Sequence, residues 1–223
     1  MNRFRLGKIV RHILHWHYRV RCINKACLYD GKTHLVMPNH PAYIDPILLF
    51  AECAEIPLRP FSDARFFRNR FYRWALSLAN AVQVPDLEKS HEREADAARI
   101  RQLAPTAIEA LKQGQDIVFY PSGHVKLIDR EVIGNRRLAY EVCAALPDNV
   151  EVVLVRTRGL EGSHWSKLPK KTHCLRRDVT MTFEVMTSQI RQWAATCDRR
   201  EFNQHLEEWY NNNTIVLDNT SEK

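Results

Sequence analysis

The sequence has no long uncharged apolar segment and no paired cysteines. None of its apolar runs approaches the roughly 18 residues that a membrane-spanning helix needs. The basic N-terminus also lacks the apolar centre and cleavage site of a secretory signal. The six cysteines are scattered over 223 residues without a CxxC pair, and no histidines cluster at zinc-ligand spacing. We therefore expect reduced, mostly buried thiols, no disulfide framework, no metal site and a cytoplasmic protein.

The composition favours one globular domain with a basic surface. Hydrophobic residues make up 45% of the chain, which is enough for a single core at this length. Thirty-three lysines and arginines against 26 acidic residues leave a net charge of +7. Such a charge attracts nucleic acid, an anionic membrane surface or a phosphate-bearing substrate. No RNA-recognition, zinc-finger or KH signature is present, so a nucleic-acid partner rests on charge alone and is not expected.

The first twenty residues predict a basic amphipathic helix. Apolar side chains recur at helical spacing from Leu6 to Val20, and basic residues occupy the other side. Such a helix either packs on the domain or lies among anionic lipid headgroups, and one helix can do both. We expect residues 1–30 to associate with the cytoplasmic face of the membrane.

Strand and helix patterns alternate along the rest of the chain. Apolar runs predict strands at 33–37, 81–84, 116–120, 150–155 and 179–185. Helical periodicity is found at 44–53, 64–79, 91–112 and 134–146. This alternation predicts a single α/β domain over residues 31–187, with a largely parallel central sheet flanked by helices.

The C-terminal part predicts helices that pack on this domain over residues 188–210. Asp198 and Glu201 have the spacing of a capping box, and the helix they begin carries Phe202, Leu206 and Trp209 on one face. Residues 211–223 are polar and are expected to be disordered.

The first candidate site follows the strand at 33–37. A histidine on a loop, His40, is followed five positions later by Asp45 at the start of a helix. The carboxylate can fix the histidine tautomer and stabilise the imidazolium, which leaves the other ring nitrogen to take a proton from a hydroxyl. The alternative is structural, because Asp45 also suits the N-cap of the helix that follows.

The second candidate site follows the strand at 116–120. Pro121-Ser122-Gly123 breaks the strand, and the glycine permits close approach of the backbone to a ligand. Exposed N–H groups and Lys126 suit a phosphate. A nucleophilic serine is disfavoured, because the turn is not a GxSxG elbow.

Together, residues 39–45 and 119–124 resemble the NHxxxxD and FPEGTR motifs of the glycerolipid acyltransferases, the lysophosphatidic acid and glycerol-3-phosphate acyltransferase superfamily. Residues 65–68 resemble its second motif, and 152–155 its fourth. Residues 156–167 are also similar to the acyltransferase part of bacterial 2-acylglycerophosphoethanolamine acyltransferase and acyl-carrier-protein ligase proteins, although no ligase accompanies them here.

The resemblance implies a transfer of a fatty acyl group from acyl-CoA or acyl carrier protein to a hydroxyl of a lysophospholipid or related glycerol-phosphate acceptor. His40 would act as general base with Asp45 as its partner, without metal or cofactor. The motif residues implied to bind substrate are Asn39, Arg65, Arg68, Pro121, Ser122, Gly123, His124 and Lys126. Arg137 is a weaker candidate for a phosphate.

This chain departs from the third motif at two positions. Ser122 stands where the family has glutamate, and His124 stands where it has threonine or arginine. A serine predicts a roomier and less acidic acceptor pocket. An alternative is a membrane-binding module that keeps the fold but has lost turnover, with Ser122 as the mark of decay. The intact pair of His40 and Asp45 counts against that alternative.

Overall fold

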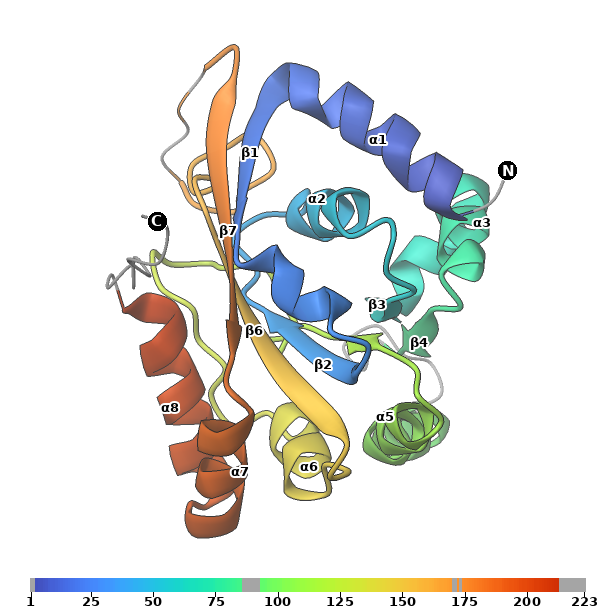
Figure 1. Cartoon of the computed structure of the whole chain (residues 1–223), viewed down its shortest axis with the longest axis vertical. Coiled ribbons are helices and arrows are strands. Elements are labelled where there is room, and N and C mark those ends of the chain that lie inside the picture. The colour runs from blue at the N-terminus through green and yellow to red at the C-terminus, as the bar shows by residue number, and fades with distance from the viewer. Residues whose placement is uncertain (1–2, 86–92, 170–171, 173, 213–223) are drawn as a thin grey trace.

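The computed structural model describes residues 3–85, 93–169, 172 and 174–212. Its centre is a seven-stranded sheet in the order β1-β7-β6-β2-β5-β3-β4 (Figure 1). The strands are β1 Tyr18–Ile23, β2 Thr33–Pro38, β3 Arg59–Asp63, β4 Val82–Val84, β5 Ile117–Val118, β6 Val150–Arg158 and β7 Arg177–Val185.

Neighbouring strands are parallel except at the β6–β7 pair. The expected α/β fold with a largely parallel sheet is therefore confirmed. Residues of β2 and most of β6 are buried, in keeping with runs of valine and leucine that are covered on both faces. Because β6, β2, β5 and β3 run in the same direction, their carboxyl ends meet at one edge of the sheet, where α/β folds usually assemble their sites.

Eight α-helices and two 3-10 helices are described around the sheet. They are α1 Arg3–His17, η1 Lys25–Tyr29, α2 Asp45–Glu52, η2 Ala64–Arg68, α3 Arg70–Leu78, α4 Arg93–Arg101, α5 Leu103–Lys112, α6 Leu138–Ala144, α7 Thr187–Thr196 and α8 Arg199–Asn211. Helices α5 to α8 lie on one side of the sheet, and α1 and α2 lie on the other (Figure 1).

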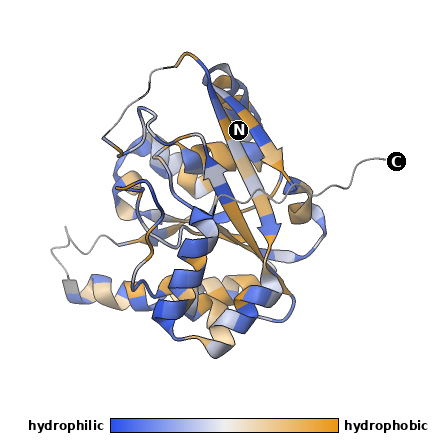
Figure 2. Ribbon diagram, turned by 90° about the vertical axis from the view of Figure 1, so that its left-hand side faces the viewer, coloured by the Kyte–Doolittle hydropathy of each residue, from blue (hydrophilic) through white to orange (hydrophobic). Residues whose placement is uncertain are grey.

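The sheet has a core on each face because successive side chains of a strand point to opposite sides. In β2, Leu35 and Met37 join the core under α5 to α8, whereas Val36 joins the core under α2. The central strands are accordingly mostly hydrophobic in Figure 2, and the helices mix hydrophilic and hydrophobic residues.

The N-terminal segment is helix followed by strand. The helix was predicted to continue to Val20, but α1 ends at His17. The residues that follow form β1, which pairs in parallel with β7. The prediction missed that Tyr18, Val20 and Cys22 alternate with arginines, which is the period of a strand. Residues 18–23 therefore belong to the same sheet as the strands of 31–187. Helix α1 packs on α2 and on the turn that follows it, where a Cβ at Gly7 would lie 2.4 Å from the Cβ of Ala54.

Several other predicted boundaries were wrong. The helix expected over 64–79 is divided into η2 and α3 by the extended residue Asn69, and the one expected over 91–112 is divided into α4 and α5 at Gln102. Residues 91–92 lie outside the described residues. The strand expected at 116–120 is only Ile117–Val118, and the helix expected from 134 begins at Leu138.

The C-terminal prediction is confirmed in its main feature. Asp198 and Glu201 form the capping box, and Phe202 and Leu206 are buried. The tail expected to be disordered falls, from residue 213 onward, outside the described residues.

All six cysteines are free thiols. Only Cys53 and Cys143 are buried, and Cys174 is exposed, so the expectation that most are buried is wrong. Among the described helices, none has the length and apolar character needed to cross a bilayer.

Candidate active site

The centre of the site is a hydrogen-bonding contact between His40 and Asp45. The Nδ1 atom of His40 lies 2.9 Å from Oδ2 of Asp45, and their side chains are 15% and 2% exposed. This contact assigns the Nδ1–H tautomer to His40, which places a lone pair on Nε2. Within the described residues, Nε2 makes no hydrogen bond, so it is available to a substrate proton.

Asp45 is held by the loop that carries His40. Its Oδ2 also accepts a hydrogen bond from the backbone N–H of Ala42 at 3.1 Å. The residue that caps α2 is Ile44, without a side-chain bond, so the alternative of Asp45 as N-cap is wrong. The carboxylate turns back toward the histidine and does not cap the helix.

Tyr120 packs against the imidazole of His40, with ring centroids 4.4 Å apart. Burial, followed by the negative charge of the nearby Asp45, raises the pKa of Tyr120 well above its ordinary value of 10. The phenol therefore stays neutral and forms one wall beside the histidine.

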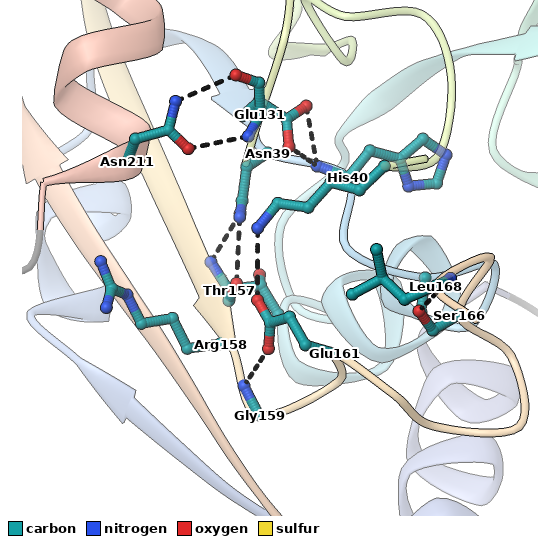
Figure 3. A network of polar contacts seen from close by, with 12 residues as sticks. Asn39, His40, Glu131, Thr157, Arg158, Gly159, Glu161, Ser166, Leu168 and Asn211 are labelled. Carbon is teal, nitrogen blue, oxygen red and sulfur yellow. Dashed lines mark hydrogen bonds and ion pairs between the residues drawn. The ribbon is translucent and has the colours of Figure 1, made fainter. Parts of the chain in front are cut away.

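The loop after β5 closes the other side of His40. The N–H of Lys126 donates to the carbonyl of His40 at 2.9 Å. Its ammonium group lies 3.4 Å from Glu161, whose other oxygen accepts from the N–H of Gly159. These contacts join the loops after β2, β5 and β6 into one cluster (Figure 3).

Glu131 belongs to this cluster although sequence reasoning missed it. It is 2% exposed, and both of its carboxylate oxygens lie 3.3 Å from the backbone nitrogen of His40. Burial raises its pKa above 4.5, against the opposing effects of the nearby Ser122 hydroxyl and of the His40 N–H. A single glutamate in an irregular stretch has no local sequence signal that would mark it.

The family assignment rests on a match that covers more than half of the chain. The profile of the Acyltransferase family matches residues 19–145, which is more than half of the sequence. This chain belongs to the acyltransferase family. The predicted glycerolipid acyltransferase superfamily is thereby confirmed, whereas the nearer likeness to the ligase-fused bacterial proteins stays a prediction.

A solved structure supports the fold of this acyltransferase. The chain is similar to the 1-acyl-sn-glycerophosphate (LPA) acyltransferase PlsC from Thermotoga maritima, with a TM-score of 0.56 and 14% identity over 92% of this chain and 79% of that one. At this identity the likeness concerns the fold alone.

The predicted third motif of the acyltransferase lies at the site. Pro121 and Ser122 are buried, and Ser122 donates to the carbonyl of His124 at 3.1 Å. Gly123 has a φ of +64°, a conformation that favours glycine, and is exposed beside the guanidinium of Arg136. Glu131 brings a carboxyl group close to Ser122, and the expectation of a roomier and less acidic acceptor pocket stays a prediction.

Asn39 is tied to β6. Its amide nitrogen donates to the carbonyl of Thr157 at 3.0 Å, and its oxygen accepts from the Thr157 N–H at 2.7 Å. Both contacts are visible in Figure 3. They give Asn39 a role in placing the His40 loop, and substrate contact by this residue stays a prediction.

The arginines predicted to bind phosphate do not belong to the cluster around His40. Arg65 and Arg68 lie in η2 after β3, two strands away from β2 and thus about 10 Å along the sheet edge. Arg65 pairs with Asp63. Arg137 pairs with Glu141 in α6 at 2.7 Å. Arg136, which the sequence did not single out, is the arginine beside the Gly123 turn.

A second polar cluster lies at the opposite end of β2. Asp30, His34 and Glu151 each place one possible metal-ligand atom within 4.8 Å of the others. The ammonium group of Lys32 already contacts Glu151 and lies 3.8 Å from Asp30. This lysine accounts for the two carboxylates without a metal ion.

Proposed function

We propose that this acyltransferase moves a fatty acyl group from a thioester, acyl-CoA or acyl carrier protein, to a hydroxyl of a lysophospholipid or related glycerol-phosphate acceptor. The observation that carries the proposal is the contact of 2.9 Å between His40 and Asp45 at the carboxyl end of β2, in a chain of the acyltransferase family. A general base with an available Nε2 is the group that an acceptor hydroxyl needs.

The proposed reaction is a direct transfer. Nε2 of His40 takes the proton of the acceptor hydroxyl while its oxygen attacks the thioester carbonyl. The new C–O bond forms, the C–S bond breaks, and the thiolate of the donor leaves with the proton that His40 returns. Asp45 stabilises the transient imidazolium. General-base action of this kind contributes about 10²- to 10⁴-fold to a rate.

The Gly123 turn is the proposed place for the phosphate of the acceptor. It combines a backbone that a ligand can approach closely with the guanidinium of Arg136. Lys126 is less suited, because its side chain is 9% exposed and its ammonium group faces Glu161. This arrangement supports an anionic acceptor and leaves the identity of its headgroup open.

The proposed location is the cytoplasmic surface of an anionic membrane. Helix α1 buries Leu6 on the domain but exposes Ile9, Ile13 and Trp16 at 49%, 54% and 69%. Basic residues alternate with these apolar ones along the exposed side of α1. A helix that presents both kinds of side chain is suited to the interface between headgroups and acyl chains.

Apolar side chains are also exposed on the loops beside His40. They are Tyr43, Leu127, Ile128 and Trp165, between 41% and 58% exposed. The backbone N–H of Tyr43 bonds to the carbonyl of Trp165, which attaches this rim to the His40 loop. Such a rim can receive the acyl chains of the substrates from a bilayer.

The proposal is tested by an acyl-transfer assay with the full chain. Purified protein is given radiolabelled palmitoyl-CoA or palmitoyl-acyl carrier protein with a panel of lysophospholipids and glycerol 3-phosphate, and the lipids are separated by chromatography. We expect His40→Ala to lower turnover by about 10²- to 10⁴-fold. His205→Ala, which removes a half-buried histidine stacked on Trp193 in the C-terminal helices, is the matched control and should keep wild-type turnover.

Two outcomes would count against the proposal. Turnover above about a tenth of wild type in folded His40→Ala would exclude this histidine as the base. Lipid binding without transfer from either donor would favour the alternative of a membrane-binding module.

A further inference from the structure

The backbone of His40 is held from both sides by the loop after β5. Its carbonyl accepts from Lys126, and its N–H points to the two oxygens of Glu131, each 3.3 Å from the nitrogen. Figure 3 shows the Glu131 carboxylate directed at this N–H. The peptide that precedes the imidazole therefore depends on a buried carboxylate ninety-one residues away in the sequence.

Glu131 is placed by the last helix. The side-chain amide of Asn211, at the end of α8, donates to the Glu131 carbonyl at 2.9 Å and accepts from its N–H at 2.7 Å. Figure 3 shows this paired contact. The residues after Glu131 are bound in the same way, because Glu207 accepts from the N–H groups of Ile133 and Gly134 at 2.7 Å.

Asn203 completes the attachment by donating to the carbonyls of Gly134 and Arg136, each at 2.8 Å. Residues 131–137 form neither helix nor strand. Because regular hydrogen bonding does not fix this segment, the side chains of α8 set where Glu131 lies.

The Glu131 carboxylate lies near the position at which the third motif of this chain has a serine in place of the family's glutamate. Ser122 occupies the position at which the resembling motif has glutamate. Its hydroxyl donates to the carbonyl of His124, and the Glu131 carboxyl group lies close enough for Ser122 to influence its pKa. Serine is short, so it leaves room for a carboxylate from another segment. Both side chains are buried, at 1% and 2% exposure.

We propose that Glu131 is a positioning residue of the active site, which orients the His40 peptide and supplies, from a segment held by α8, the carboxylate that Ser122 does not provide. This inference rests on the proposed function of His40. Two measurements test it, and the first does not depend on turnover.

The first measurement follows the backbone amide of residue 40 by NMR in the full-length His40→Gln protein, which keeps the backbone contact and carries no ionisable side chain at this position. An amide that donates to a carboxylate reports the titration of that carboxylate. Since burial raises the pKa of Glu131, the shift of the residue-40 amide in this background should show a step above pH 4.5. The step should vanish in Glu131→Gln and persist in Glu109→Gln, which alters an exposed carboxylate of α5. A step that persists in Glu131→Gln would overturn the contact.

The second measurement compares the turnover of variants in which the carboxylate is removed from position 131, added at position 122, or moved from one position to the other. Glu131→Ala should lower kcat by about tenfold to a hundredfold with little change in KM, because it disturbs geometry and not binding. Ser122→Glu alone should also lower kcat, since it brings two carboxylates together. The double variant Ser122→Glu/Glu131→Ser should recover kcat to within about tenfold of wild type, and Glu109→Gln should not change it.

The results separate this inference from the proposed function. Wild-type kcat in folded Glu131→Ala, or a folded double variant no more active than Glu131→Ala, would overturn the positioning role. If the wild-type protein transfers no acyl group from any donor, the proposed function fails, whereas the amide titration still decides whether Glu131 holds the His40 peptide.

Discussion

The substitution Asp45→Asn tests how much the negative charge of Asp45 contributes to turnover when the geometry of its contact with His40 is kept. One carboxylate oxygen accepts both from His40 and from the Ala42 N–H. The carbonyl oxygen of asparagine can take its place and keep both bonds, so the change removes mainly the negative charge. A charge-assisted hydrogen bond exceeds a neutral one by about 1–1.5 kcal/mol. Two opposite charges 4 Å apart attract by about 4 kcal/mol at an effective dielectric constant of 20. Between these limits, kcat should fall by about tenfold to a thousandfold.

The assay for this prediction is acyl transfer at saturating donor, together with urea unfolding. Asp148→Asn is the matched control, because the side chain of Asp148 is fully exposed. In a His40→Ala background, Asp45→Asn should cause no further loss, since Asp45 acts through the histidine. A kcat above about a third of wild type in a protein of unchanged stability would refute the reasoning.

Two further predictions concern stability and membrane binding. Burial alone would lower the pKa of His34, but its contact with Asp116 and the charges of Asp30 and Glu151 raise it above 6.5. The folded state therefore binds a proton more tightly, and the stability it adds is present below pH 6.5 and lost as the pH rises through the folded value. Urea unfolding should show this loss, and His34→Gln should flatten it; an unchanged slope would contradict the assignment. For α1, replacement of its two most exposed apolar residues, Ile13 and Trp16, by serine should reduce flotation with anionic vesicles, and high salt should partly release the wild type. Equal flotation with neutral and anionic vesicles would refute the electrostatic part.

The sequence predicted best those features that depend on neighbouring residues. The capping box of α8 spans three positions, so residue types and spacing were sufficient to predict it. The long apolar strand β6 was found for the same reason. The His40–Asp45 contact spans five positions, and the resemblance to the NHxxxxD motif was needed to favour it over a capping role for Asp45. Strand β1 was missed because a run of helical spacing passes directly into a run of strand spacing, and the boundary lies between two compatible patterns.

The sequence did not predict the contacts between segments that lie far apart along the chain. Glu131 reaches His40 across ninety-one residues, and Asn211 reaches Glu131 across eighty. The segment 131–137 has no periodicity, so nothing local indicates which side chain turns inward. Its place is decided by side chains of α8, a helix whose apolar face was predicted but whose polar contacts were not.

The departure at Ser122 bears on whether the chain is an enzyme. Decay of an active site predicts that a lost charged group leaves a gap, because no selection maintains a substitute. Here a carboxylate from Glu131 lies against the serine, and three side chains of α8 hold the segment that carries it. Burying a carboxyl group costs free energy, and the raised pKa of Glu131 reflects this cost. A fold that has only to bind a membrane gains nothing from such a group at its centre. The arrangement therefore argues for a site that is maintained for turnover, with Ser122 and Glu131 acting as a pair.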